Sequence, residues 1–211
     1  AFELAERYDR AAPKWQRTTS RLGAPRGYDF LFERFLTQSQ LARTRTLRAL
    51  DCGIGGGQFS LALARTWAGP LLIDGVDISP AMVAETRRNL RASNIEARVI
   101  QANVRTLPYP ANRFDLIIAA HILEHLPDPI VALKEMRRVL KPGGWLVACF
   151  TRTSLLGRYV QLKWRTHRLS DQLAQSWLQE AGLQPQRSPS KLPGLTGLIS
   201  LPALARAATG E

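Results

Sequence analysis

Short apolar segments alternate with helix-length connections between residues 45 and 150, and this pattern constrains the fold more than any other feature. Strands joined by connections of helix length pair in parallel, through right-handed crossovers. Residues 114–120, FDLIIAA, are almost wholly apolar, as in a strand that is buried on both faces. We therefore predict an α/β fold built on a doubly wound, mostly parallel sheet. The predicted strands are 46–52, 71–77, 97–102, 114–120 and 145–150, and the predicted helices are 58–67, 80–92 and 129–140.

Two helical stretches precede this alternation. Residues 2–19 have partly helical spacing that Pro13 interrupts, and residues 27–42 carry apolar side chains with the i, i+3, i+4, i+7 spacing of one helix face. Neither stretch belongs to the strand–helix pattern. We predict that residues 1–44 form an N-terminal helical cap or lid over a core of residues 45–211.

The C-terminal tail contains one clear helix and an ambiguous end. Residues 170–181 are a predicted helix, with Ser170 as its N-cap. Residues 183–191 and 198–207 are predicted to form a final antiparallel pair of strands. Pro202 removes a hydrogen-bond donor from the second of them, so a helix or an irregular segment is the alternative there.

Composition is that of an ordinary globular protein, with 45% hydrophobic and 22% charged residues in 211. That length suits one domain with a sizeable core. No run of 18 apolar residues predicts a transmembrane helix, and the charged start AFELAERYDR has no signal-peptide core. Cys52 and Cys149 fall in separate predicted strands, so we expect two buried thiols in a reducing cytoplasm.

The net charge of +12 is compatible with nucleic acid, anionic lipid or an acidic substrate as partner. However, 24 of the 29 basic residues are Arg, and they are spread along the whole chain. A general surface charge is therefore favoured over a dedicated site for a polyanion.

A glycine-rich loop follows the first predicted strand, at residues 51–57, DCGIGGG. Glycines let the backbone turn sharply and approach a ligand closely, and the helix from Gln58 aims its N-terminal N–H groups at the same place. The loop does not fit the dinucleotide fingerprint G-x-G-x-x-G; it reads D-x-G-x-G-x-G. A fixed charge at Asp51 would repel a pyrophosphate but suits a cationic sulfonium ligand that carries an ammonium group.

Polar residues also end the second and third predicted strands. Asp77 ends the second strand and can accept hydrogen bonds from both hydroxyls of a ribose, although a solvated surface carboxylate is the plain alternative. Asn103 follows the third strand and offers a donor and an acceptor to an adenine edge, with a simple turn residue as the alternative.

These motifs, in this order, resemble class I methyltransferases, and especially the subgroup of ubiquinone and menaquinone biosynthesis methyltransferases. The resemblance covers about residues 45–150 and extends weakly to the N-terminal Tyr8-Asp9-Arg10-Ala11-Ala12-Pro13-Lys14. It is specific for the cofactor and not for the substrate. The motifs that carry it are Asp51–Gly57, Gly75–Ser79, Phe114-Asp115-Leu116-Ile117, Glu124-His125-Leu126-Pro127-Asp128-Pro129 and Leu140-Lys141-Pro142-Gly143-Gly144.

The resemblance implies a Rossmann-like fold and S-adenosyl-L-methionine as the cofactor. Asn103 stands where the family usually has Asp, and we expect its side-chain oxygen to keep the adenine contact. Val104 and Ala120, near the ends of the third and fourth strands, complete the predicted cofactor site. The other implied contacts are Asp51, Gly53, Gly55 and Gly57 with the methionine moiety, Asp77 with the ribose, and Ile78 and Met82 with the adenine.

Two histidines are candidates for a general base, which methylation of carbon or of a hydroxyl oxygen requires. His121 directly follows the fourth strand, where the methyl group and its acceptor should meet, and His125 lies about one helical turn later. Cofactor packing is the alternative for His121, and a structural role in its turn is the alternative for His125.

Three aromatic residues of the predicted cap, Tyr8, Trp15 and Tyr28, are candidates for closing the substrate pocket. Core packing is the alternative for Trp15 and Tyr28. No metal ligand set is predicted, and the oligomeric state is not indicated.

The predicted function is methyl transfer from S-adenosylmethionine to a small organic metabolite by in-line displacement. The alternative acceptor is a membrane-borne quinone or phospholipid, reached by peripheral contact of the basic surface and the apolar residues 192–208 with an anionic membrane. Those residues are otherwise the last strands of the core. Nucleic acid is the least favoured partner, because residues 119–122 lack the Asn/Asp-Pro-Pro-aromatic motif. A non-catalytic S-adenosylmethionine-binding protein is the alternative of another class.

Overall fold

The computed structural model describes residues 24–39, 41–151, 170–188, 192–193 and 200–209. The described strands are β1 (Leu47–Cys52), β2 (Leu71–Asp77), β3 (Ala97–Gln101), β4 (Phe114–Ala120), β5 (Leu140–Thr151), β6 (Leu183–Gln186) and β7 (Ser200–Ala207). The described helices are α2 (Ala24–Ser39), α3 (Gln58–Thr66), α4 (Pro80–Ala92), the 3₁₀ turn η1 (Leu123–His125), α5 (Pro129–Val139) and α7 (Asp171–Glu180). The strand–helix alternation predicted from the sequence is confirmed, with boundaries that shift by a few residues.

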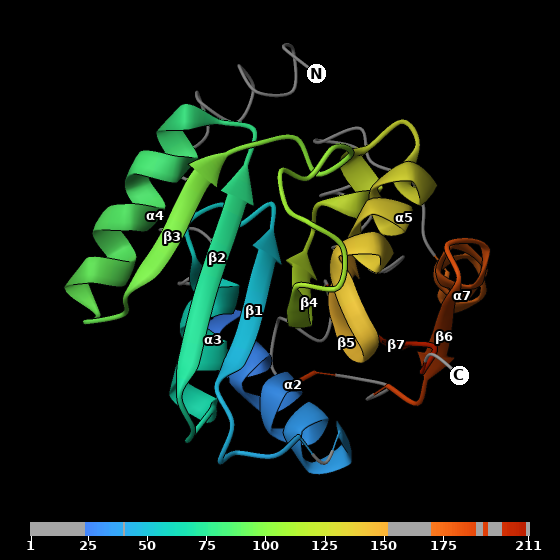
Figure 1. Cartoon of the computed structure of the whole chain (residues 1–211), viewed down its shortest axis with the longest axis horizontal. Coiled ribbons are helices and arrows are strands. Elements are labelled where there is room, and N and C mark those ends of the chain that lie inside the picture. The colour runs from blue at the N-terminus through green and yellow to red at the C-terminus, as the bar shows by residue number, and fades with distance from the viewer. Residues whose placement is uncertain (1–23, 40, 152–169, 189–191, 194–199, 210–211) are drawn as a thin grey trace.

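The seven strands form one sheet in the order β3-β2-β1-β4-β5-β7-β6. The first five pair in parallel, and β7 runs antiparallel to both β5 and β6. In Figure 1 the arrowheads of β1, β2 and β3 point to the same edge of the sheet. The chain turns outward in one direction from β1 to β3 and in the other from β4 onward, so the switch point lies between β1 and β4. Ligands bind at this place in doubly wound sheets, outside the carboxyl ends of the strands.

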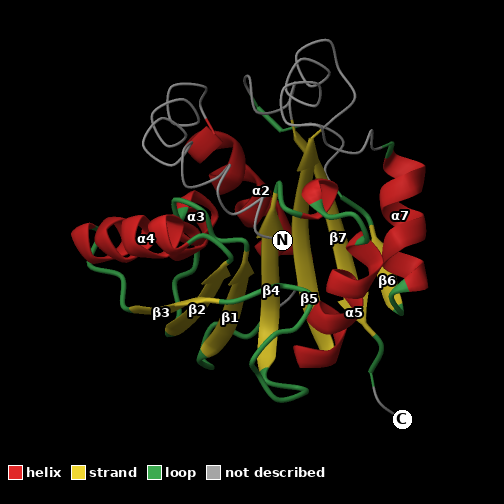
Figure 2. Cartoon of the chain, turned by 90° about the horizontal axis from the view of Figure 1, so that it is seen from above, coloured by secondary structure: helices red, strands yellow, loops and turns green. Residues whose placement is uncertain are grey.

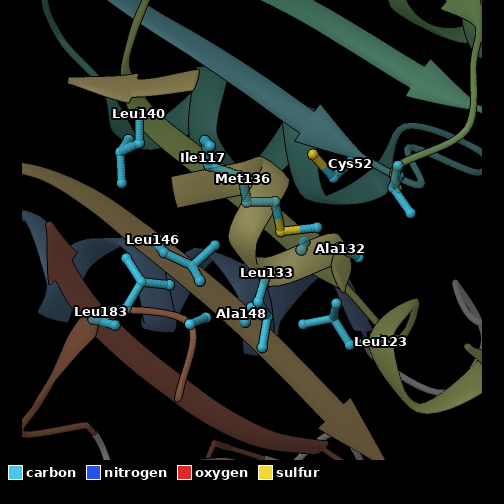
Figure 3. Packing of buried hydrophobic residues seen from close by; sticks show 14 of the residues in the cluster. Cys52, Ile117, Leu123, Ala132, Leu133, Met136, Leu140, Leu146, Ala148 and Leu183 are labelled. Atoms are coloured by element: carbon cyan, nitrogen blue, oxygen red, sulfur yellow. The ribbon is translucent and has the colours of Figure 1, made fainter. Parts of the chain in front are cut away.

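Helices cover both faces of the sheet. Figure 2 shows α2, α3 and α4 on one face and α5 and α7 on the other. Because successive side chains of a strand point to opposite faces, β1 supplies Ala49 to the core under α2 and α3 and Cys52 to the core under α5. Figure 3 shows the second of these cores, in which Met136 and Leu133 of α5 pack onto the sheet. Cys52 and Cys149 are both free and buried, as predicted.

Helix α2 is the described part of the predicted N-terminal cap. Its apolar stripe is buried against the sheet and α3, and Tyr28 and Phe32 each pack on Phe59 with ring centroids 4.8 Å apart. Residues 24–39 therefore complete the core on the α3 face. The boundary at residue 44 stays a prediction, and residues 1–23 lie outside the described part.

Strand β5 is longer than the sequence predicted. Leu140 already pairs with Phe114, and the regular register resumes at Trp145 opposite Leu116, so the intervening Lys-Pro-Gly-Gly residues form an irregular part of the strand. Gly143 adopts a φ of +71°, which glycine tolerates without strain. The predicted limit at Trp145 was wrong because pairing with β4 continues across residues that favour a turn.

The predicted antiparallel pair at the C-terminus is confirmed as β6 and β7. Strand β6 pairs with residues 204–207 of β7, so among the described strands Pro202 has a neighbour on one side, Cys149 of β5. Proline has no backbone N–H to donate, and a strand tolerates it where only one side is paired. Pro202 is therefore compatible with strand β7. Leu204 and Ala205 are buried in the sheet.

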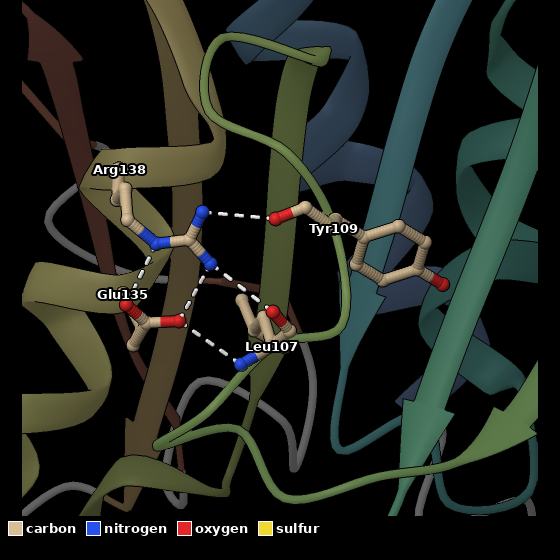
Figure 4. A network of polar contacts seen from close by, with 4 residues as sticks. All are labelled: Leu107, Tyr109, Glu135 and Arg138. Atoms are coloured by element: carbon tan, nitrogen blue, oxygen red, sulfur yellow. Dashed lines mark hydrogen bonds and ion pairs between the residues drawn. The ribbon is translucent and has the colours of Figure 1, made fainter.

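The long connection from β3 to β4 is fastened to α5 (Figure 4). Arg138 donates a forked pair of hydrogen bonds to Glu135 and two more to the carbonyl oxygens of Leu107 and Tyr109, at 2.8–3.1 Å. Glu135 in turn accepts from the N–H of Leu107 at 3.0 Å. Backbone N–H and C=O groups outside regular elements need hydrogen-bond partners. Here the ion pair of Arg138 and Glu135 supplies them to the connection that contains Asn103 and Val104.

Candidate cofactor site and active site

The loop between β1 and α3 is shaped by three glycines in the left-handed region. Gly53, Gly55 and Gly57 have φ values of +71°, +53° and +81°. A Cβ at Gly53 would lie 2.8 Å from Cγ1 of Ile122, the residue that follows β4 by two positions. The loop and the end of β4 are therefore in direct contact across the switch point. Within the described part of the chain, a Cβ at Gly55 would meet no atom closer than 3.9 Å, so those residues leave space above it.

Helix α4 holds the same loop from the side. The hydroxyl of buried Thr86 donates to the carbonyl of Gly55, and the amide of Asn89 donates to the carbonyl of Gly56 at 3.0 Å. Helix α4 begins as predicted, with Pro80 in the first turn and the hydroxyl of Ser79 accepting from the N–H of Met82 at 3.1 Å. A well-capped helix thus fixes two loop carbonyls, and the loop is preorganised.

Asp51 lies at the end of β1 and is 1% exposed. Its Oδ2 accepts a hydrogen bond from the hydroxyl of Ser60 in α3 at 2.7 Å. Burial raises the pKa of Asp51 to about 7, with a further rise from the charge of Asp77 and an opposing effect from Ser60. A buried carboxylate with this pKa is poised to ionise when a cation approaches.

Asp77 lies at the tip of β2, beside the loop, and is 8% exposed. Its Oδ2 accepts from the N–H of Gly55 and its Oδ1 from the N–H of Ser79, both at 2.9 Å. The two backbone donors orient the carboxylate at the tip of β2. The structure therefore places Asp51 and Asp77 on the two strands that flank the glycine loop.

The three residues predicted near the adenine, Ile78, Met82 and Asn103, have different surroundings, and Val104 of the predicted cofactor site is described with them. The carbonyl of half-buried Ile78 accepts from the amide of Gln101 at 3.1 Å. Met82 and Val104 are 1% and 5% exposed, which gives them little surface for a ligand in this state. The Oδ1 of Asn103 accepts from the N–H of Arg105 at 3.0 Å, so this side chain stabilises the turn in which it lies. The adenine contacts stay predictions.

His121 lies directly after β4, next to half-buried Ala120. Its backbone has a φ of +55°, which is uncommon outside glycine, and its N–H donates to the carbonyl of Cys149 at 2.8 Å. The ring Nδ1 lies 3.3 Å from Oε1 of Glu124 and 3.2 Å from Oγ1 of Thr151. The imidazole is 16% exposed, at the carboxyl edge of the sheet.

Glu124 is a buried carboxylate that sequence reasoning missed. Its Oε1 accepts hydrogen bonds from the N–H and the hydroxyl of Thr151, both at 2.8 Å. Burial alone would raise its pKa, but the hydrogen bond from His121 and the charges of His121 and His125 outweigh burial, and the pKa lies below the usual value. Glu124 is thus an ionised group inside the protein.

His125 and the aromatic candidates are less closely tied to this edge. His125 ends η1 and is half-buried, and its N–H donates to the carbonyl of Ile122 at 3.0 Å. Tyr28 is buried against Phe59, and burial raises its pKa above the usual range. Tyr8 and Trp15 lie outside the described residues, so their predicted roles stay predictions.

Most residues that sequence reasoning missed act through a partner distant in sequence. Thr151 lies 27 residues from Glu124, and Thr86 lies 31 residues from the loop carbonyl that it holds. Ser60 is nearer, nine residues after Asp51, and a hydroxyl in the first turn of the predicted helix was the local signal available.

S-adenosylmethionine fits the groups that the structure presents. Its sulfonium and ammonium suit the buried acid Asp51, and its ribose hydroxyls suit Asp77. The two carboxylates therefore match a cationic nucleoside better than a pyrophosphate.

Comparison with known proteins supports the same conclusion. Residues 50–148 match the family model described as a methyltransferase domain. A demethylmenaquinone methyltransferase of Staphylococcus aureus (strain MRSA252) is 34% identical over 116 residues, which are 55% of this chain and 48% of the relative. The chain thus spans about half the length of the curated relatives it matches.

Solved structures show how widely the fold recurs. A SAM-dependent methyltransferase from Aquifex aeolicus has a TM-score of 0.65 at 19% identity, over 84% of this chain and 89% of that one. The 4+2 cyclase SpnF has a TM-score of 0.69 at 23% identity, over 86% and 81%. At these identities the likeness concerns the fold, and the family match concerns the methyltransferase domain. Residues 50–148 thus match the methyltransferase-domain family, and the fold is like that of solved S-adenosylmethionine-dependent methyltransferases.

Proposed function

We propose that this chain catalyses methyl transfer from S-adenosylmethionine to a small organic acceptor by in-line displacement. The observation that carries the proposal is the meeting of three features at the switch point of the sheet. These are the glycine loop after β1, the carboxylates of Asp51 and Asp77 that flank it, and His121 after the adjacent strand β4. A nucleotide site beside a titratable side chain is what a transferase of this kind requires.

The residues of the loop and its flanks bind and orient the cofactor. Asp51 offers its carboxylate to the cationic methionine end, and Asp77 accepts from the ribose hydroxyls. S-adenosylmethionine, when bound, supplies a methyl group whose bond to sulfur breaks with its electron pair remaining on sulfur as the acceptor atom bonds to the methyl carbon. The rigid loop fixes the direction of approach, and alignment of this kind supplies much of the acceleration.

His121 is the proposed general base, and His125 is the second candidate. His121 lies at the carboxyl edge with 16% of its side chain exposed, whereas His125 belongs to the turn that follows. A histidine at this place takes up a proton from the acceptor as the new bond forms. The proposal requires that His121→Gln lowers turnover more than His125→Gln does.

A quinone is the second candidate acceptor, and the name of the Staphylococcus aureus relative favours it. Among the described residues, no helix is both long and apolar enough to cross a membrane. Residues 200–207, which the membrane-contact prediction included, form β7 with Leu204 and Ala205 buried in the sheet. A peripheral contact would then depend on the basic surface and on residues 192–199, of which only 192–193 are described.

Release of S-adenosylhomocysteine in a panel of small acceptors, including a reduced short-chain demethylmenaquinone, tests the proposal. We expect turnover that Asp77→Ala abolishes and that Asp74→Ala leaves intact. Asp74 is a matched control because it lies in the same strand and pairs with Arg113 rather than with the loop. Release with the quinone alone would favour the second candidate, and pelleting with anionic vesicles at low salt would add the membrane. No release with any acceptor, together with no cofactor binding, would refute the proposal.

A further inference from the structure

A buried polar cluster joins the end of β4 to the end of β5. Glu124 is 1% and Thr151 3% exposed. The Oε1 of Glu124 receives both the N–H and the hydroxyl of Thr151 at 2.8 Å. Nδ1 of His121 faces the same two residues, 3.3 Å from Oε1 and 3.2 Å from the hydroxyl oxygen. One carboxylate oxygen, Oε1 of Glu124 in the short turn, thus lies next to side chains from the ends of both strands, His121 and Thr151.

Proton accounting in this cluster fixes the tautomer of the histidine. A threonine hydroxyl has one proton, and Thr151 donates it to Glu124. The hydroxyl oxygen can then only accept from Nδ1, and the ionised Oε1 can also only accept. Both atoms described as facing Nδ1 are therefore acceptors, so Nδ1 carries the proton. In the neutral ring the lone pair then lies on Nε2.

Two costly features at the same place argue that the cluster does more than hold the fold together. The Oε2 of Glu124 is buried and has no hydrogen-bond partner among the described residues, which costs about 1–3 kcal/mol for a polar group. His121 adopts a φ of +55°, which costs about 1–3 kcal/mol more in a non-glycine residue. A glutamine or an aliphatic side chain at position 124 would avoid the buried charge. Such costs persist mainly where a site needs them.

We propose that Glu124 and Thr151 are positioning residues that hold His121 as its Nδ1–H tautomer with Nε2 as the basic atom, so that the acceptor is a group that must lose a proton. This deepens the proposed function and rests on it. The acceptor class is a hydroxyl or an acidic carbon. A tertiary amine or a thioether already has a free lone pair and needs no base.

The proton step balances within this arrangement. The O–H or C–H bond of the acceptor breaks, its proton passes to Nε2 of His121, and its electron pair stays on the acceptor atom as the nucleophile. The ring becomes an imidazolium that still donates from Nδ1 to Glu124. The buried carboxylate stabilises that cation, as the aspartate of a Ser-His-Asp triad stabilises its imidazolium.

Long-range ¹H–¹⁵N spectra of the full-length, histidine-labelled protein measure the tautomer without any substrate. The chain has three histidines, His121, His125 and His167, and loss of one signal set in His121→Gln assigns the resonances. We expect the neutral His121 ring to show a protonated Nδ1 and an unprotonated Nε2. A protonated Nε2 in the wild type would overturn the proposal.

Variants test which residue sets the tautomer. Glu124→Met removes the carboxylate, so the Thr151 proton becomes available to Nδ1, and we expect the Nε2–H form to appear. Thr151→Val leaves the carboxylate as the acceptor, and we expect the Nδ1–H form to persist, as also in Thr151→Ser. Glu124→Gln is the variant closest in shape, and it keeps an acceptor oxygen opposite Thr151. Glu135→Gln, in the α5 network, is the matched control and should change nothing at His121. An unchanged tautomer in Glu124→Met would contradict the assignment.

Two further readouts separate this proposal from the proposed function. Calorimetry with S-adenosylhomocysteine should give equal affinities for wild type, Glu124→Gln and Thr151→Val, because the hydrogen bonds described for Glu124 and Thr151 join them to each other and to His121 and not to the loop. Release of S-adenosylhomocysteine should occur with a phenol or a quinol and not with trimethylamine or dimethyl sulfide. With the accepted substrate, Glu124→Gln should lower kcat at least tenfold with little change in KM. Turnover of the amine or the thioether alone, or an unaltered kcat, would refute the positioning role. No cofactor binding in the wild type would refute the proposed function and leave the tautomer result standing.

Discussion

Replacement of Asp51 by asparagine should stabilise the fold at high pH while it weakens cofactor binding. Asp51 is 1% exposed, and burial raises its pKa to about 7 from an ordinary value of 3.8. An asparagine has nearly the same shape, and its side-chain oxygen can still accept from the hydroxyl of Ser60. The variant removes the buried charge and little else.

The pKa values set the size and the pH window of the effect. The folded chain binds the Asp51 proton more tightly than the unfolded chain, so this group's contribution to stability is full below pH 3.8 and is lost as the pH rises to about 7. The two pKa values differ by about three pH units, and each is worth about 1.4 kcal/mol. The variant should therefore exceed the wild type in free energy of unfolding by about 2 kcal/mol at pH 5 and about 4 kcal/mol at pH 8.

Urea unfolding at pH 5 and pH 8 measures this difference through the transition midpoints. Ser60→Ala serves as a companion, because it removes the hydrogen bond that lowers the pKa of Asp51 and should extend the pH dependence to higher pH. Binding of S-adenosylhomocysteine should weaken in Asp51→Asn, since its ammonium loses an ionised partner. Equal stability gains at both pH values, or a variant less stable than the wild type at pH 8, would refute the reasoning.

Four more substitutions probe the structure around the site. Gly53→Ala should cost about 2 kcal/mol, because its Cβ would overlap Ile122 at a φ of +71°; Gly55→Ala, with open space at its Cβ, should cost less in the same thermal melts. Ser79→Ala should cost about 1 kcal/mol by removing the N-cap of α4, and an unchanged melting temperature would show that the cap contributes nothing. Arg138→Ala should speed amide exchange at residues 103–109 and cost about 1 kcal/mol, whereas unchanged exchange there would show that the connection does not depend on α5.

The regular elements were predictable because their signals are local. The apolar run 114–120 became β4 with the same bounds, and Ser79 with Pro80 marked the start of α4 to the residue. The glycine loop and Asp77 could also be found, since a parallel sheet brings the carboxyl ends of neighbouring strands to one edge. Local pattern and strand geometry together were sufficient to bring these residues to one edge of the sheet, as the candidate site requires.

The rest depends on contacts that no local pattern encodes. Leu140 joins β5 because it pairs with Phe114, although the residues that follow it favour a turn. Glu124 meets Thr151 only because η1 folds back onto the end of β5. The apolar stripe of α2 predicts that one face of the helix is buried, but it does not indicate that this face packs beside α3.

Calorimetry with S-adenosylhomocysteine on wild type, Asp77→Ala and Asp74→Ala tests most directly that the loop between β1 and α3 is the cofactor site. Asp77 orients the loop through Gly55 and is the proposed acceptor for the ribose hydroxyls, so its loss should weaken binding on the order of a hundredfold. Asp74→Ala should bind like the wild type. Equal affinity in all three proteins would contradict the account.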